Sequence, residues 1–184
     1  MSYDLTLWIF NVFALVLGLV LGSFYNVCIH RYLEEQSIVR PGSHCPNCQH
    51  QLSWWENIPL LSYLLLRGHC FECKKTISWQ YPLVEAISGI WALLLALKFG
   101  LGWPWLVYLL MGGILIVASF IDLKSFILPD FLTLPGGLLA LFCAIFLLDM
   151  DWQISLFGGL AGAGGFWLLQ QIYKLVKGIE GLGT

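Results

Sequence analysis

The sequence predicts an all-α polytopic membrane protein with about five transmembrane helices and a small cytoplasmic zinc-binding loop domain. Of its 184 residues, 59% are hydrophobic and 11% are charged, whereas soluble domains carry about 25% charged residues. The apolar residues form long runs, each near the ~20 residues that cross the hydrocarbon core of a bilayer. The polar segment between the first two runs contains two pairs of closely spaced cysteines. This composition excludes a soluble globular domain.

The apolar runs divide the chain into three parts. They cover residues 5–29, 82–99, 103–121, 131–148 and 154–176. The first run has no basic segment before it and is too long for the apolar core of a signal peptide, so we expect it to be a retained span. The expected organisation is therefore a first span in 1–29, an extramembrane domain in 30–81 and a four-span membrane domain in 82–184.

The basic residues predict which side of the membrane each loop occupies. All of them except Lys98 fall in the segment 30–81, in the loop after the third span or in the tail after the fifth. Cytoplasmic loops carry the excess of lysine and arginine. We therefore expect a cytoplasmic cysteine loop and a periplasmic N-terminus. The net charge of -2 and the lack of a basic patch give no indication of nucleic-acid binding.

The cysteine loop is predicted to bind zinc. Two C-x2-C pairs supply four thiolates, which can close a tetrahedral zinc shell, although the gap between the pairs is slightly longer than usual. The ligands would be Cys45, Cys48, Cys70 and Cys73. A domain this small builds little core, so the metal would supply stability. We expect little regular structure between the pairs and no internal repeat.

Histidines and glycines receive structural interpretations. His44 and His69 each directly precede the first cysteine of a C-x2-C pair. We expect both histidines outside the metal shell because four thiolates already complete it. The glycines of the fifth span, at 158, 159, 162, 164 and 165, favour close helix packing. A phosphate-binding loop is a poor interpretation of these glycines because no Lys-Ser/Thr pair follows them.

Two aspartates are candidates for chemistry. Asp122 closes the third span, where an ionisable group is costly unless it meets water or a partner. It is either a functional carboxylate or a carboxylate that marks the helix end. Asp130 follows Pro129 and fits an N-cap of the fourth span. Two carboxylates that share a site can activate water against an amide, but the spacing does not require these two to meet.

Four segments, in order along the chain, resemble the type IV prepilin peptidases. They are GSFYNV at 22–27 followed by Arg31, the cysteine loop with WENIPLLSY at 55–63, YPLVE at 81–85, and the ID and LPD elements within 121–130. The resemblance implies a GxGD-type aspartic protease of the bacterial inner membrane. Such enzymes cleave a short basic leader from prepilins or pseudopilins of type IV pilus and type II secretion systems at the cytoplasmic face. They then methylate the new N-terminus with S-adenosylmethionine.

The resemblance also implies roles for individual residues. Asp122 matches the family's first catalytic aspartate, and Asp130 remains a weak candidate for the second. Glu56, Asn57 and Glu85 fall in motifs that we associate with methyl transfer or substrate contact. The family's second aspartate belongs to a GxGD motif, whose first two residues match 183–184, and the Gly-Asp that should follow is missing. One carboxylate cannot be proton donor and general base at once, so we expect this polypeptide to be inactive or nearly so as a peptidase.

Another class of function is compatible with the same residues. The chain would then be a membrane-anchored zinc module, used for methyl transfer or partner binding without proteolysis. A purely structural assembly subunit explains the motifs least well.

Overall fold

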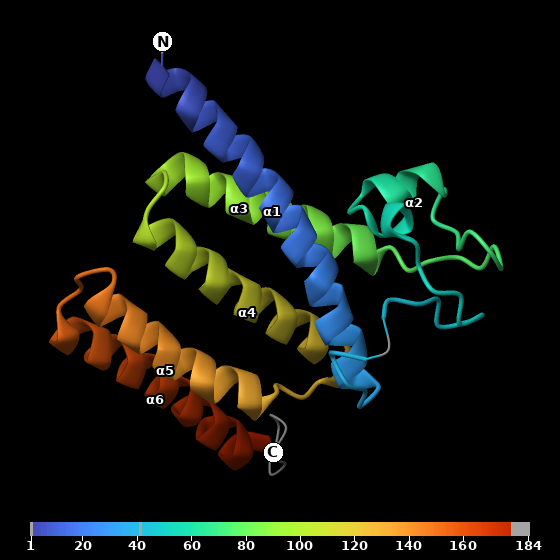
Figure 1. Cartoon of the computed structure of the whole chain (residues 1–184). Coiled ribbons are helices and arrows are strands. Elements are labelled where there is room, and N and C mark those ends of the chain that lie inside the picture. The colour runs from blue at the N-terminus through green and yellow to red at the C-terminus, as the bar shows by residue number, and fades with distance from the viewer. Residues whose placement is uncertain (1, 41, 178–184) are drawn as a thin grey trace.

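The computed structural model describes residues 2–40 and 42–177, and it is built from helices (Figure 1). The long helices are α1 (Ser2–Leu33), α3 (Gln80–Phe99), α4 (Trp103–Ser125), α5 (Asp130–Phe146) and α6 (Trp152–Lys177). Two short helices, η1 (Trp54–Asn57) and α2 (Leu61–Leu65), lie in the cysteine loop. Each predicted span corresponds to one long helix, so the all-α prediction is confirmed. The described residues form isolated β-bridges and no strand.

Three helices are long and apolar enough to cross a membrane. They are α1, α3 and α4, with apolar windows within Leu5–Leu33, Gln80–Phe99 and Trp103–Ser125. Helix α5 is apolar, but its 17 residues make it shorter than these three helices. Helix α6 is not among the helices identified as candidate spans. Crossing of the bilayer by α5 and α6 therefore stays a prediction.

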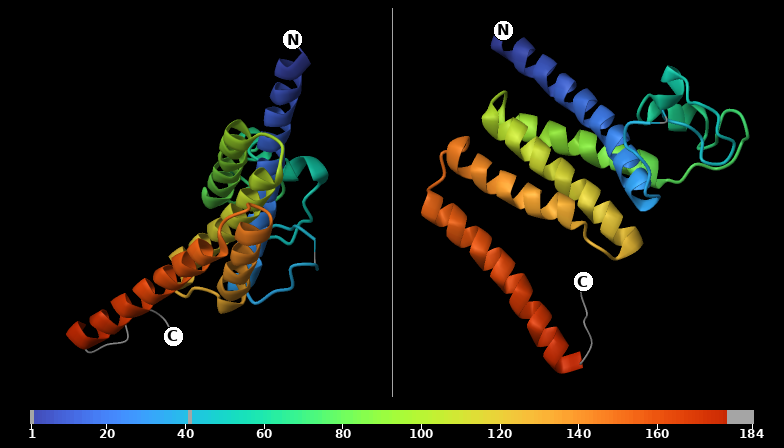
Figure 2. Two further views of the ribbon diagram at one scale, coloured as in Figure 1. Left: turned by 90° about the vertical axis from the view of Figure 1, so that its left-hand side faces the viewer. Right: turned by 60° about the horizontal axis from the view of Figure 1, so that its bottom comes forward.

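The long helices pack in chain order. Helices α3, α4, α5 and α6 lie side by side, each against the next, and α1 lies across α3 and α4 (Figures 1 and 2). Because successive helices run in opposite directions, the C-terminal ends of α1 and α4 and the N-terminal ends of α3 and α5 gather at one end. The cysteine loop extends from this end (Figure 1). The grouping predicted from the basic residues therefore agrees with the direction of the helices.

The core lies where α1 meets α3 and α4. Two buried clusters occupy this interface, one around Ala14, Ala92 and Trp105 and the other around Ile29, Val84 and Ile121. The outer faces of the helices expose large hydrophobic side chains, as expected for surfaces that meet lipid.

Glycines allow α1 and α3 to approach closely. A Cβ atom at Gly18 would lie 2.5 Å from the Ser88 carbonyl oxygen, and one at Gly22 would lie 2.7 Å from the Glu85 Cα atom. This is the small-residue packing that brings membrane helices together. Gly22 opens the GSFYNV segment, so that motif has a packing role.

The glycines of α6 do not pack as predicted. A Cβ atom at Gly158, Gly159, Gly162, Gly164 or Gly165 would meet no described atom within 4 Å. Helix α6 contacts α5, and its described side chains are mostly exposed. The close packing attributed to these glycines occurs between α1 and α3.

Gly18→Ala is expected to lower the free energy of unfolding by about 1–3 kcal/mol, the usual cost of overpacking a tight interface. The added methyl meets Ser88 backbone and cannot be relieved by a side-chain rotation. Unfolding in detergent, followed by helix content, measures the effect. Gly137→Ala is the matched control, because its Cβ atom meets nothing within 4 Å in α5. Equal stability of the two variants would contradict the packing assignment.

Candidate functional site

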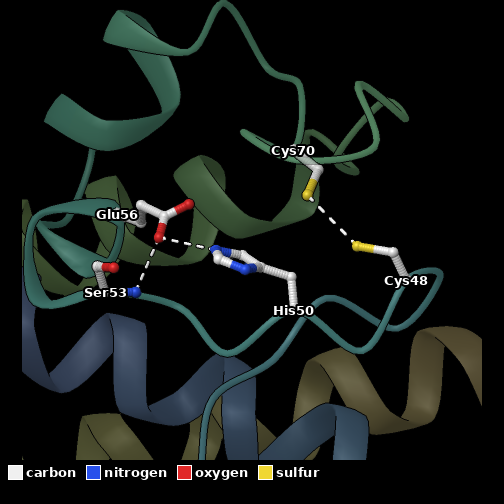
Figure 3. A network of polar contacts seen from close by, with 5 residues as sticks. All are labelled: Cys48, His50, Ser53, Glu56 and Cys70. Carbon is white, nitrogen blue, oxygen red and sulfur yellow. Dashed lines mark hydrogen bonds and ion pairs between the residues drawn. The ribbon is translucent and has the colours of Figure 1, made fainter.

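The four predicted metal ligands come together in the cysteine loop. The Sγ atoms of Cys45 and Cys73 are 3.9 Å apart. Those of Cys48 and Cys70, drawn in Figure 3, are 4.0 Å apart. All four sulfurs lie within 4.8 Å of one another. A tetrahedral zinc site with Zn–S bonds of about 2.3 Å places its sulfurs about 3.8 Å apart. The donor set and its spacing therefore fit zinc.

The two knuckles have the same backbone structure. The Cys45 N–H donates to the His50 carbonyl at 2.9 Å, and the Cys70 N–H donates to the Lys75 carbonyl at 2.9 Å. Each knuckle is closed by an isolated antiparallel bridge, one between His44 and Gln51 and the other between His69 and Thr76. In each C-x2-C pair, the residue after the second cysteine has a positive φ; these residues are Gln49 and Lys74.

This duplication is also visible in the sequence, and the prediction of no repeat was wrong. Residues 43–54 read SHCPNCQHQLSW and residues 68–79 read GHCFECKKTISW. The two segments share His-Cys-x2-Cys, an aliphatic residue four positions later (Leu52 and Ile77), and then Ser-Trp. A repeat this short is not visible as a periodic pattern of hydrophobic residues. It becomes visible when the two cysteine pairs are aligned with each other. We call the two segments the first and second knuckle.

One cysteine of the cluster is strongly activated by its neighbours. The Asn47 amide donates to the Cys73 Sγ at 3.6 Å, and the Lys75 ammonium donates to the Asn47 Oδ1 at 2.7 Å. The Lys75 backbone N–H, followed by the Asn47 amide and two neighbouring thiols, outweighs desolvation and lowers the pKa of Cys73 to about 6. Thiolates are the form that binds metal. The lowered pKa favours the metal-binding form of Cys73.

Both histidines that precede a cysteine lie outside the sulfur cluster. The Nδ1 atom of His44 lies 2.9 Å from the Gly42 carbonyl, and that of His69 lies 2.6 Å from the Arg67 carbonyl. These contacts orient each ring toward the backbone two residues earlier. The expectation that neither histidine completes the metal shell agrees with this geometry.

Glu56 is buried in a polar network between the first knuckle and η1 (Figure 3). Its Oε2 atom accepts the Ser53 backbone N–H at 2.8 Å and lies 3.1 Å from the His50 Nε2. Burial alone would raise the pKa of Glu56, but these hydrogen bonds and the His50 ring lower it overall. Its Oε1 atom is buried without a partner. Glu56 therefore fixes His50 of the first knuckle to the start of η1.

Glu85 anchors the loop to α3. Its Oε2 atom accepts the Leu60 backbone N–H at 2.8 Å, and Leu60 has a φ of 60°, which is rare for a residue with a side chain. Asn57, the third residue expected in this group, is exposed at the end of η1. The loop contacts of Glu56 and Glu85 were not foreseen, because they depend on how the chain turns between the knuckles.

The C-terminal half of α1 supplies two further anchors. The Asn26 amide donates to the Tyr81 carbonyl in the first turn of α3 at 3.0 Å. The buried Arg31 guanidinium donates to the Ser37 carbonyl at 2.6 Å and the Gly42 carbonyl at 3.4 Å. These bonds explain why α1 continues to Leu33, beyond the predicted span end at residue 29.

The two candidate aspartates are exposed at the end of the bundle from which the loop extends. Asp122 lies in the last turn of α4, and its carbonyl accepts the Phe126 N–H at 2.8 Å. Asp130 is the first residue of α5, and Pro129 occupies the N-cap position expected for Asp130. Within residues 2–40 and 42–177, no hydrogen bond or ion pair joins the two carboxyl groups. The expected approach to a GxGD motif, at 183–184, lies outside the described residues.

A mainly apolar groove opens between α1, α4 and α5, with a volume of about 420 Å³. Ile121, the residue before Asp122, lines it. At its loop end it meets the polar side chains of Arg31, Glu35 and Gln36. We call it the α1–α4–α5 groove.

Two family models match successive parts of the chain. The model of the bacterial peptidase A24 N-terminal domain matches residues 16–99, which contain both knuckles. The model of the type IV leader peptidase family matches residues 109–184, which contain both candidate aspartates. No solved structure gives a significant match.

Curated relatives are similar over nearly the whole chain. A protein of Myxococcus xanthus named prepilin leader peptidase/N-methyltransferase is 43% identical over 177 residues, covering 96% of this chain and 52% of the relative. Proteins of the same name are 39% identical in Stutzerimonas stutzeri and 38% identical in Neisseria gonorrhoeae. The matches cover 95% and 93% of this chain, respectively, and 68% of each relative. The chain thus spans between about half and two thirds of the length of these relatives.

Cys45→Ser is expected to remove bound zinc, because three thiolates leave the tetrahedral shell open. Metal analysis of the purified protein measures the loss. Cys28→Ala is the matched control, because Cys28 lies in α1 and is not part of the sulfur cluster. Zinc content that is unchanged in Cys45→Ser would contradict the ligand assignment.

Glu56→Gln is expected to destabilise the loop by about 1–3 kcal/mol at pH 7, since a buried charged acceptor is lost. Folding lowers the pKa of Glu56. Its contribution is therefore complete above the ordinary glutamate value of about 4.3 and disappears as the pH falls through the lowered value. Hydrogen exchange over residues 50–57 at several pH values, corrected for intrinsic rates, measures the difference from wild type. Glu72→Gln, at an exposed position of the second knuckle, should show no change. If Glu56→Gln exchanged its amide hydrogens over residues 50–57 at the wild-type rate at pH 7, the stabilising role of the Glu56 hydrogen bonds would be refuted.

Proposed function

This chain belongs to the type IV prepilin leader peptidase/N-methyltransferase family, and from that membership we propose that it acts on prepilins or pseudopilins at the cytoplasmic face of the bacterial inner membrane. It would cleave their leader peptide and methylate the new N-terminus. One observation carries the proposal. Asp122 falls within the segment matched by the leader peptidase family model and lies next to the end of the α1–α4–α5 groove.

The groove suits an apolar helix as substrate. Its lining is mostly apolar along α1 and α4, and polar groups gather only at the loop end. An N-terminal helix of a prepilin would lie along the groove, with its leader at the end that carries Asp122. Asp122 follows the groove residue Ile121 and is turned about 100° around α4 from it. The carboxylate would therefore stand at the edge of the bound helix.

Peptide hydrolysis by carboxyl groups needs one ionised member and one protonated member. Asp122 would supply one of them and hold the attacking water at the end of α4. Asp130 begins α5 on the far side of the short connection and is the candidate partner among the described residues. The family pattern places the partner in a GxGD motif.

The cysteine loop would serve the same reaction by holding its end of the bundle in place. Zinc bound by the four thiolates would close the two knuckles into one unit, since a complete thiolate shell leaves no position for substrate. Methyl transfer would use S-adenosylmethionine, with Glu56, Asn57 and Glu85 near the transfer site. The N-terminus would be periplasmic and the loop cytoplasmic, as the distribution of basic residues predicts. A zinc module without proteolysis is not favoured, because the peptidase family model matches the segment of Asp122.

Cleavage of a prepilin in membranes that contain this protein tests the proposal. This chain carries one matched carboxyl group of the pair and is expected to be inactive or nearly so. Extended through the family's GxGD motif, the wild type should release the leader, and Asp122→Asn in that background should reduce the rate at least ~100-fold, as expected for loss of a general acid or base. Asp130→Asn provides the comparison: a similar loss would assign the second carboxyl group to it, and a small loss would leave Asp130 as a helix-end residue. Normal cleavage by Asp122→Asn, or none by the wild type, would overturn the proposal.

A further inference from the structure

Helix α2 has an unusual distribution of side chains for a helix in an extramembrane loop. Leu61, Leu64 and Leu65 form one face and are 56%, 70% and 76% exposed. The other side of the helix faces the second knuckle, where the Tyr63 ring packs against Gly68. The Gly68 N–H also donates to the Tyr63 carbonyl at 2.8 Å. The apolar face of α2 therefore points away from the loop, and no described residue covers it.

A hydrogen bond fixes the level of this face relative to the membrane helices. The Leu60 N–H, at the N-cap of α2, donates to the Glu85 carboxylate at 2.8 Å. Glu85 is five residues into α3, which starts at Gln80, or about 7.5 Å along its axis. Helix side chains tilt toward the helix N-terminus, so the Glu85 carboxylate holds the start of α2 beside the first turns of α3. Because α3 is long and apolar enough to cross a bilayer, α2 is held near one end of a candidate span.

Neighbouring side chains match the chemistry of that level. Trp79, the N-cap residue of α3, is 70% exposed, and tryptophan is enriched where a helix leaves the hydrocarbon. Arg67 lies two residues beyond α2, and Lys74 and Lys75 are exposed in the second knuckle. Glu72 is the one acidic residue between residues 61 and 79 and is exposed, so this part of the loop has an excess of exposed positive charge for anionic headgroups.

We propose that α2 is an interfacial helix that inserts Leu61, Leu64 and Leu65 into the headgroup–acyl boundary of the bilayer that surrounds α3. Apolar faces of interfacial helices lie about 5–10 Å into this boundary, and the Leu60–Glu85 bond holds the start of α2 beside the end of α3 from which the loop extends. The bilayer is favoured over a protein partner because the Leu60–Glu85 bond holds the start of α2 beside α3, and because the nearby side chains of Arg67, Lys74 and Lys75 suit anionic headgroups. The inference requires α3 to span the membrane and is independent of peptidase activity.

Photocrosslinking in a bilayer tests the proposal directly. A benzophenone amino acid is incorporated in place of Leu64 or Leu65, and the full chain is reconstituted in nanodiscs of phosphatidylethanolamine and phosphatidylglycerol. After irradiation, mass spectrometry should find lipid adducts at both positions. Gln51 is the matched control, because it is an exposed polar residue of the first knuckle, and it should give at least about tenfold less adduct. Zinc content equal to wild type verifies that each variant keeps its loop.

Three results would overturn the proposal. The first is the absence of lipid adducts at both leucine positions. The second is an equal yield at Gln51, which would show that lipid contact is unselective. The third is crosslinked dimer in place of lipid adduct, which would assign the leucine face to a second copy of the chain. Each result is obtained without a prepilin, so none depends on whether the protein cleaves its substrate.

Discussion

The cysteine loop depends on its four sulfurs because it has almost no other interior. Within the described part of residues 34–79, the buried residues are Cys45, Glu56, Gly68 and Cys70. Two of these four belong to the sulfur cluster, and none is a large aliphatic or aromatic residue. A segment of this kind cannot offset the entropy of ordering through apolar burial. Closure of the two knuckles around one ion would supply the missing free energy.

The closed loop is held to the helices by polar contacts, and these contacts explain much of the motif sequence. Glu85 holds Leu60, Asn26 holds the Tyr81 carbonyl, and Arg31 holds the segment that leads to the first knuckle. The same turns of α1 and α3 approach closely at Gly22. The position of the loop is therefore coupled to the packing of the two helices that it connects, and through α4 to the end of the bundle that carries Asp122.

The architecture was largely predictable from sequence, since spans of about 20 apolar residues leave few alternatives to helices. The zinc ligands were predictable because the spacing of each cysteine pair reflects local turn geometry. The contacts of Glu56 and Glu85 were not, since they depend on the path of the chain between the knuckles. For example, Leu60 adopts a positive φ that no local rule predicts for leucine. The prediction of close packing at the α6 glycines was wrong among the described residues. Composition shows that a helix can pack closely, but it does not identify the helix that packs against it.

X-ray absorption at the zinc edge tests the central claim of the account, that four thiolates from two repeated knuckles close one site. The account predicts one zinc per chain, with a first shell of four sulfurs at about 2.3 Å. A shell that contains nitrogen from His44, His50 or His69, or protein that folds its loop without zinc, would contradict it.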